Sequence, residues 1–234
     1  MPFKTVANFG KVKKKKIPDE NEIETEKWAK VDNFSIVDSV IKNRRSVRKY
    51  QVKEVDFELI RKILEAARFA PSCGNYQPWE FIVVRDPEMK KNLVEACHNE
   101  NFNEKWMLEA PVFIVACINS RLAGALYGDR GLKLYGVQGV AAAVENMLLA
   151  AQSLGLATCW VGAFSEIMVA RLLECPEYVR PCAIITLGYS YELRCGVPAR
   201  QNLEEFVHIG KFGNTLHQEY INREKRSTNM KFRS

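Results

Sequence analysis

The spacing of apolar residues predicts that helices alternate with short strands from about residue 34 onward. After Asp56, a favourable N-cap, apolar side chains recur at i, i+3, i+4 and i+7, namely at Ile60, Ile63, Leu64 and Ala67. A shorter helical stripe begins near Ser35 and ends at Ile41. Residues 88–98 predict another helix, and Ser165 caps a small one that ends near Glu174.

Continuous apolar runs predict four strands, at residues 81–84, 112–118, 156–161 and 183–188. The long segment 132–154 predicts a helix that is apolar on nearly every side. Such a helix must be buried, either at the centre of a domain or at a subunit interface. Residues 122–131 contain three glycines and predict a loop, and residues 99–109 allow no assignment.

This order of elements predicts one α+β or α/β domain with an extension at each end. We place the N-terminal extension at residues 1–33, the core at 34–195 and a C-terminal extension at 196–234. The last forty residues contain so few apolar candidates that we expect them to pack on another surface, such as a partner subunit.

Composition describes ordinary globular material, with 234 residues of which 47% are hydrophobic and 26% charged. The net charge of +6 comes largely from a lysine run at 11–16 and a basic tail at 223–233. Terminal basic runs are usually solvated, so we do not expect nucleic-acid binding. The longest apolar stretch includes Glu145 and Gln152, which argues against a membrane span. We expect a cytoplasmic protein.

The seven cysteines include no C-x-x-C pair, so neither a zinc site nor a redox disulfide is expected. Histidine is scarce: His98 falls in a predicted helix, and His208 and His217 lie near the C-terminus. A Ser-His-Asp or Cys-His catalytic centre is therefore poorly supported. No G-x-G-x-x-G opens a helix after a strand. An enzyme of this sequence would rely on a bound cofactor for its chemistry.

Four segments could together bind an extended anion that carries an aromatic ring. Arginine forks suit phosphate, small and amide side chains suit a polar ring edge, and glycine permits close approach of backbone. Each segment also has a plain structural reading: surface charge, an ordinary turn, a strand exit and a solvated arginine. The four are Arg44-Arg45-Ser46-Val47-Arg48, residues 71–77, residues 158–163, and Arg200.

Taken in order, these segments resemble the FMN-dependent nitroreductase family over about residues 34–207. The resemblance rests on Arg-Arg-Ser-x-Arg at 44–48, Ala-Pro-Ser-x-x-Asn-x-Gln-Pro-Trp at 70–79, Ala110-Pro111 before an apolar strand, and the stretch from Glu145 to Phe164. It implies an α+β fold with a mixed central sheet flanked by helices. It also implies an intertwined homodimer with two FMN sites at the interface.

The resemblance also implies roles for particular residues. Arg44, Arg45, Ser46 and Arg48 would hold the phosphate, ribityl chain and pyrimidine edge of FMN. Pro71, Ser72, Cys73 and Asn75 would line the ring from the other subunit, and Gln77 is a further cofactor-binding candidate. The backbone of Trp160, Val161 and Gly162 would cover one face, with the Gly162 N–H near N5, and Arg200 would close on the phosphate. Relatives often carry a second basic residue where this chain has Pro198. The resemblance implies no metal and no catalytic side chain.

The implied reaction has two steps, in which NAD(P)H reduces FMN and a nitroaromatic, quinone or similar small acceptor then takes the electrons. One alternative keeps the fold and changes the chemistry, to reductive dehalogenation or flavin fragmentation. That chemistry usually needs a lid, for which residues 102–108 are the candidate segment. Another alternative is a non-catalytic protein that binds FMN, or that binds nucleic acid through its basic termini.

Overall fold

The computed structural model describes residues 33–97, 104–191 and 198–217. The chain divides into two units, residues 1–193 and 194–234, which are described separately. The first unit holds four strands, β1 (Trp79–Val84), β2 (Val112–Asn119), β3 (Ala157–Val161) and β4 (Val179–Gly188). Its helices and helical turns are α1 (Asn33–Asn43), α2 (Phe57–Arg68), η2 (Cys73–Asn75), α3 (Pro87–Ala96), η3 (Glu104–Glu109), α4 (Ser120–Gly124), α5 (Gly128–Arg130), η4 (Gly131–Tyr135), α6 (Gly136–Ser153) and α7 (Glu166–Leu172).

The four strands form one sheet in the order β1-β2-β4-β3, and every neighbouring pair is antiparallel. The predicted α+β class is confirmed. The parallel component of the expected mixed sheet is limited, in the described residues, to a single bridge between Ser46 and Thr158. That bridge lies on the outer edge of β3. A segment from the start of the domain therefore covers one edge of the sheet.

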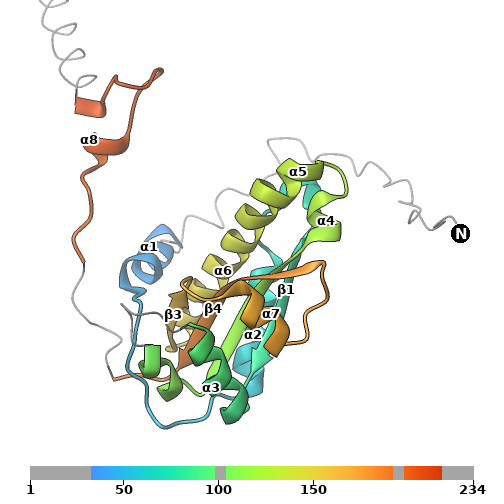
Figure 1. Ribbon diagram of the computed structural model, residues 1–234. Coiled ribbons are helices and arrows are strands. Elements are labelled where there is room, and N and C mark those ends of the chain that lie inside the picture. Colours follow the sequence, from blue (N-terminus) through green and yellow to red (C-terminus); the bar gives the residue numbers. More distant parts are fainter. Residues whose placement is uncertain (1–32, 98–103, 192–197, 218–234) are drawn as a thin grey trace, which may run out of the picture. The chain divides into compact units, whose positions relative to one another are not determined.

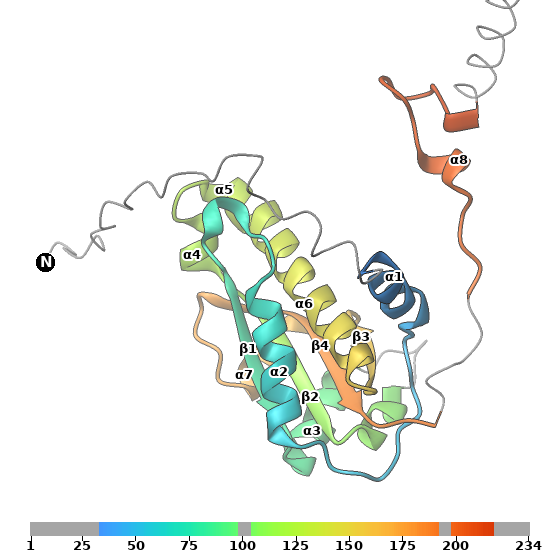
Figure 2. The ribbon, with the colours of Figure 1, turned by 180° about the vertical axis from the view of Figure 1, so that it is seen from behind.

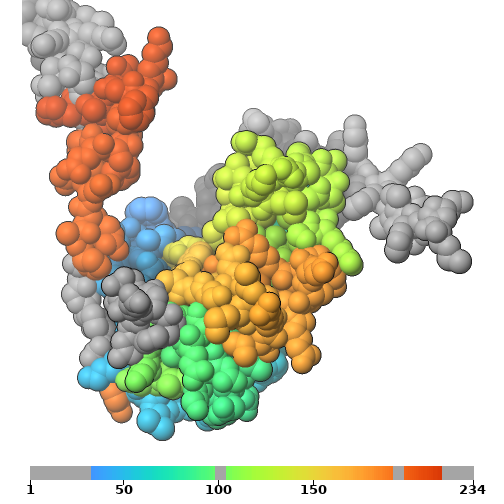
Figure 3. Space-filling view, viewed as in Figure 1, coloured from blue at the N-terminus to red at the C-terminus, as the bar shows by residue number. Residues whose placement is uncertain are grey.

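Helices cover both faces of the sheet (Figure 1). The helices α2 and α6 pack on one face, against Ile114, Ala116 and Ile185. On the other face, α3, η3 and α7 pack against Phe113, Val115 and Ile184. Because successive strand residues point to opposite faces, β2 is buried along almost its whole length. Figure 3 shows the surfaces of α3 and α7 side by side on this second face.

The helix α2 begins as its sequence predicts. The Asp56 carboxylate accepts a hydrogen bond from the backbone N–H of Glu58, and Ile60, Ile63 and Ala67 are buried. The predicted small helix after Ser165 is also confirmed, since the Ser165 hydroxyl accepts from the N–H of Met168.

The predicted loop at 122–131 is wrong, because this stretch is mostly helical. The Asn119 side chain caps α4 by accepting from the N–H of Leu122. The π-helical turn η4 then leads directly into α6. A Cβ atom at Gly131 would lie only 1.9 Å from the Ala123 carbonyl oxygen, so this backbone contact requires glycine.

The helix α6 is the central helix of the first face, and it buries Val140, Val144, Met147 and Leu148 among other residues. Among the described residues, the stretch 128–153 that contains it is the one helical segment long and apolar enough to cross a membrane. Its buried side chains pack against α2 and the sheet, as expected of a core helix.

None of the eleven residues of α1 is buried. Phe34, Ile36, Val37 and Ile41 each expose more than half of their surface, although they lie on one helix that flanks α6. A helix with such an apolar face ordinarily needs a partner surface. In the second unit, α8 (Leu203–Phe206) precedes a bridge between His208 and Thr215.

Candidate functional site

The arginine segment predicted to bind an anion is fixed to the free edge of β3. The backbone N–H of Val47 donates to the carbonyl oxygen of Thr158 at 2.9 Å, and Ser46 forms the parallel bridge with the same residue. Val47 itself is 4% exposed. An edge strand presents unpaired backbone groups, and here they hold the segment in place. Residues 44–48 are thus positioned by the sheet.

Tyr50 provides a second anchor for this segment. Its hydroxyl donates to the Val47 carbonyl at 2.8 Å and lies 2.6 Å from the Thr186 hydroxyl. Either hydroxyl can donate in the second contact, since the Thr186 hydroxyl also donates to the Cys159 carbonyl at 3.4 Å. Burial raises the pKa of Tyr50. The Tyr50 N–H also donates to the Glu109 carboxylate, at 3.1 Å.

The side chains of Arg44 and Arg45 have different partners. The Arg44 Nε lies 3.6 Å from Oε1 of Glu145 on α6, and 24% of the Arg44 side chain is exposed. Arg45 turns back toward the end of α1, where its Nη1 donates to the carbonyls of Lys42 at 2.6 Å and Arg44 at 2.7 Å. Those contacts satisfy carbonyls at the helix C-terminus. Arg45 therefore has a structural role in ending α1.

Arg48 lies beside an aromatic ring and a thiol. Its guanidinium carbon is 5.6 Å from the centroid of the Trp106 ring in η3. Burial raises the pKa of the Cys159 thiol, while Arg48 and a hydrogen bond with Ser46 lower it by less. The net shift is upward, so this thiol is neutral near pH 7. It adds no negative charge that would compete for the arginines.

The chain is exposed where β3 ends. Trp160 is 39% exposed, Val161 is buried and Gly162 is exposed. The strand repeat of two places the backbone groups of Trp160 on the same edge as those of Thr158. A Cβ built at Gly162 would meet a single atom within 4 Å, the Trp160 Nε1 at 3.9 Å. Packing within the chain therefore does not require glycine here, and the space above it is open.

The segment 71–77 forms a tight loop around η2. The Ser72 hydroxyl accepts from the Gln77 N–H at 3.0 Å, and Gly74, Asn75 and Gln77 all have positive φ angles. A hydrogen bond with the Cys73 thiol raises the pKa of Tyr127. The amide and hydroxyl groups of the loop are thus held in a fixed, left-handed turn.

This loop and the arginine segment lie in different parts of the first unit. The loop joins α2 to β1 beside α4 and α5, whereas the segment after α1 runs past β3 (Figure 2). Gly139, near the start of α6, faces Pro78 and Ser72, while Glu145 of the same helix faces Arg44. The structure therefore unites residues 44–48 with residues 158–162, and it leaves the 71–77 loop apart from them.

The remaining predicted residues are placed as follows. Arg200 is exposed in the second unit, where its Nη1 donates to the Ala199 carbonyl at 3.2 Å. His98 and Phe102 lie outside the described residues. The described part of the possible lid is the η3 turn, which Met107 anchors in the core.

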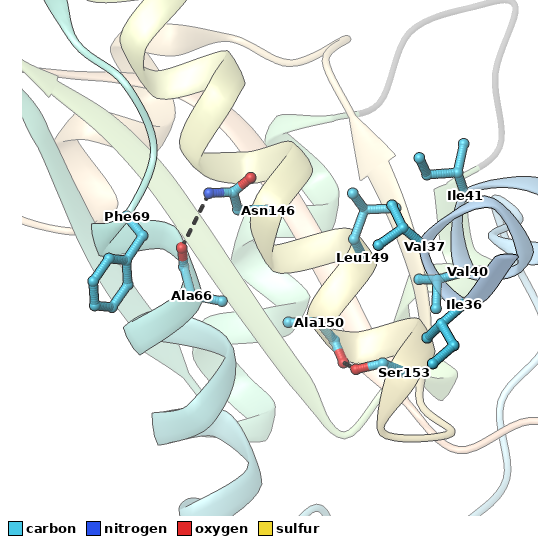
Figure 4. A pocket seen from close by; sticks show the side chains of 10 residues that line it. All are labelled: Ile36, Val37, Val40, Ile41, Ala66, Phe69, Asn146, Leu149, Ala150 and Ser153. Atoms are coloured by element: carbon cyan, nitrogen blue, oxygen red, sulfur yellow. Dashed lines mark hydrogen bonds between the residues drawn. The ribbon is translucent and has the colours of Figure 1, made fainter. Parts of the chain in front are cut away.

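An apolar groove of about 390 Å³ lies between α1, α2 and α6 (Figure 4). Val37, Val40 and Leu149 face it from α1 and α6, and Phe69 lies at the end of α2. The Asn146 side chain donates to the Ala66 carbonyl at 3.2 Å, which ties α6 to α2. The groove thus lies beside the start of the arginine segment.

Sequence reasoning missed several supporting residues. Thr158 lies within the predicted segment 158–163. Trp106 contacts the arginine segment only through the tertiary fold, and Tyr50 is held there through Thr186, so no local pattern reveals either residue. The sequence does single out Glu145, because it is the one ionisable residue in α6. Together these groups present guanidinium and hydroxyl donors next to an open backbone edge, which suits an anionic ligand with a flat ring.

The chain is similar in sequence and fold to known proteins. The profile of the Nitroreductase family matches residues 41–189. A provisionally named NADH dehydrogenase/NAD(P)H nitroreductase of Methanothermobacter thermautotrophicus is 40% identical over 167 residues, covering 70% of this chain and 81% of that protein. The FMN reductase [NAD(P)H] of Bacillus subtilis is 32% identical, covering 63% of each.

A solved FMN-dependent nitroreductase from Clostridium difficile R20291 superposes with a TM-score of 0.61. It is 29% identical, and the match covers 74% of this chain and 98% of that one. The iodotyrosine deiodinase of Nematostella vectensis is also similar, at 28% identity over 72% of each chain. The same fold therefore occurs in proteins named for different reactions.

Replacing Tyr50 with phenylalanine should lower the free energy of unfolding by about 1–3 kcal/mol, because the buried Val47 carbonyl and Thr186 hydroxyl would lose a partner. Urea unfolding followed by fluorescence measures this change. Tyr191→Phe is the matched control, since Tyr191 is 90% exposed. Equal stabilities of the two variants would contradict the anchoring role of Tyr50.

Proposed function

Because the chain belongs to the nitroreductase family and is an NAD(P)H-dependent oxidoreductase, we propose that it binds FMN along the β3 edge and reduces nitroaromatic, quinone or similar small acceptors. The observation that carries the proposal is the fixed arginine segment beside the open backbone at Gly162. The cofactor, when bound, supplies the redox chemistry between NAD(P)H and the acceptor. The chain supplies binding, orientation and charge.

The residues present fit FMN. Arg44 and Arg48 supply the guanidinium groups that a phosphate monoester prefers, and Ser46 adds a hydroxyl between them. The open position above Gly162 allows a flat ring to approach the backbone closely. A ring at this edge would shield the exposed Trp160 side chain from water. We assign the phosphate to Arg44 and Ser46, and the ring to residues 160–162.

A side-chain acid or base is not needed for this role. The thiol nearest the arginines, Cys159, is kept neutral by burial. Burial likewise raises the pKa of Cys97 to about 12 and that of Cys182 to about 11. These three thiols are therefore poor nucleophiles near neutral pH, and we assign them to the core.

We further propose that two copies of the chain complete the site. The 71–77 loop carries the amide and hydroxyl groups suited to a ring edge, yet it lies apart from the arginine segment. A second copy would bring its own loop to the ring. The groove between α1, α2 and α6 supports this arrangement, because the apolar face of α1 is exposed there. Burial of that face would supply the driving force for association.

The purified chain loaded with FMN should lose its flavin absorbance when NAD(P)H is added without oxygen, and a nitroaromatic or quinone should restore it. Absorbance spectroscopy with a panel of acceptors measures both half-reactions. A chain that takes up no FMN would contradict the proposal. Reduction by NAD(P)H followed by turnover of none of these acceptors would instead favour a dehalogenation chemistry.

Arg44→Ala should weaken FMN binding by about tenfold or more, because a hydrogen bond to a charged group contributes about 1.5–3 kcal/mol. Titration of the flavin fluorescence gives the dissociation constant. Arg61→Ala serves as the control, since Arg61 pairs with Glu58 on the exposed side of α2. If Arg44→Ala retains the original affinity, the phosphate lies elsewhere.

Dilution should release FMN together with monomer, since each ring would contact residues of both copies. Sedimentation velocity read at a flavin wavelength and at a protein wavelength follows cofactor and assembly at once. Monomers that keep one FMN per chain would refute the shared site. The Val37→Glu substitution, in the apolar face of α1, would bury a charge in the interface between the two copies. The dimer should therefore dissociate, and FMN should be released, at a higher protein concentration than in the unchanged chain.

A further inference from the structure

Glu145 stands out among the residues near the proposed phosphate site. It is the one ionisable residue in the α6 sequence, and its neighbours along the helix are apolar or amide residues. Its side chain is 48% exposed, and its Oε1 lies 3.6 Å from the Arg44 Nε. An acidic group therefore faces an arginine that we assign to an anionic ligand.

This pairing differs from the contacts of the other two arginines. Arg45 is engaged with backbone carbonyls at the end of α1, and Arg48 lies against Trp106. Of the acidic residues that the structure describes, Glu145 is the one whose ion pair involves this segment. Its charge therefore acts first on Arg44.

The geometry is that of a weak and replaceable ion pair. A separation of 3.6 Å exceeds the range of an N–H···O hydrogen bond, so the attraction is mainly Coulombic. Pairs that are partly exposed contribute little to folding stability. A phosphate dianion offers more charge and more acceptor oxygens, so it would form the stronger contact with Arg44.

We propose that Glu145 is a counter-charge to Arg44 that limits how tightly the chain holds a phosphate-bearing flavin. Its carboxylate offsets part of the positive potential at Arg44. A phosphate bound there must compete with Glu145 for the guanidinium of Arg44. Glu145 thus sets the share of the flavin affinity that comes from the phosphate. This inference rests on the proposed role of Arg44 at the FMN phosphate.

The geometry also predicts which ligands should respond to Glu145. Riboflavin has the ring and ribityl chain of FMN and lacks the phosphate. It should therefore be insensitive to the charge at position 145. Inorganic phosphate, which competes only for the phosphate position at Arg44 and Ser46, should respond in the same direction as FMN. The comparison of FMN with riboflavin separates a charge effect from a change in the shape of the site.

The test is the substitution Glu145→Gln, which keeps the size of the side chain and removes its charge. Fluorescence titration of the full chain should show FMN bound about three- to tenfold more tightly. Riboflavin should bind within about twofold of its original affinity, and inorganic phosphate should inhibit FMN binding more strongly. Glu58→Gln is the matched control, because Glu58 loses the same charge in an exposed ion pair with Arg61.

The Arg44→Ala variant and the double variant Arg44→Ala/Glu145→Gln test whether Glu145 acts on FMN binding through Arg44. If Glu145 acts through Arg44, adding Glu145→Gln to Arg44→Ala should change the FMN affinity by less than about twofold. If Glu145→Gln tightens FMN binding as much in the Arg44→Ala background as it does alone, the inference is overturned. Unchanged or weaker FMN binding by Glu145→Gln, or equal changes for FMN and riboflavin, would overturn it as well.

Failure of the inference can be told from failure of the proposed function. If Arg44→Ala weakens FMN while Glu145→Gln does not tighten it, Arg44 still binds phosphate and Glu145 has no restraining role. If Arg44→Ala leaves FMN affinity unchanged, the phosphate assignment is wrong and the inference is overturned with it.

Discussion

The proposed site depends on the hydrogen bond by which Val47 closes the outer edge of β3. An edge strand must find partners for its backbone groups, and here a segment from the start of the domain supplies one. The same contact sets where Ser46 and its flanking arginines lie. Tyr50 then fixes the far side of the segment to β4 through Thr186. One requirement of sheet structure thus positions the charged groups of the site.

This chain is a member of the nitroreductase family and an NAD(P)H-dependent oxidoreductase. In the proposed site, the protein binds the ligand, and the ligand carries out the redox chemistry. The protein's own side chains near the candidate site are arginines, hydroxyls, aromatic rings, a neutral thiol and the Glu145 carboxylate. In the proposed site, this arrangement would select a ligand by its charge and flatness and would leave electron transfer to that ligand. This division is consistent with the range of reactions named among similar proteins, since a change in acceptor would need no new catalytic residue.

Local patterns predicted much of the fold. Asp56 and the apolar stripe after it predicted α2, and the continuous apolar run at 112–118 predicted β2, because each pattern spans several residues of one element. The loop prediction for residues 122–131 was wrong because it rested on their glycine content. The Asn119 cap and the close backbone contact at Gly131 make this stretch mostly helical. The Ser46–Thr158 bridge could not be predicted, since a single pair has no periodicity. Motifs indicated the candidate site residues, which stay a prediction, while the neighbours of Arg44 and Arg48 required the tertiary structure.

Gly162 has a consequence for how such a protein can diversify. Nothing in the described chain crowds the position where its side chain would be, so a larger residue could be accepted with little loss of folding stability. The same residue would project toward whatever lies over the strand exit. Substitutions at Gly162 would therefore leave a well-folded protein whose ligand access has changed. Selection could adjust reactivity at this position without first restoring stability elsewhere.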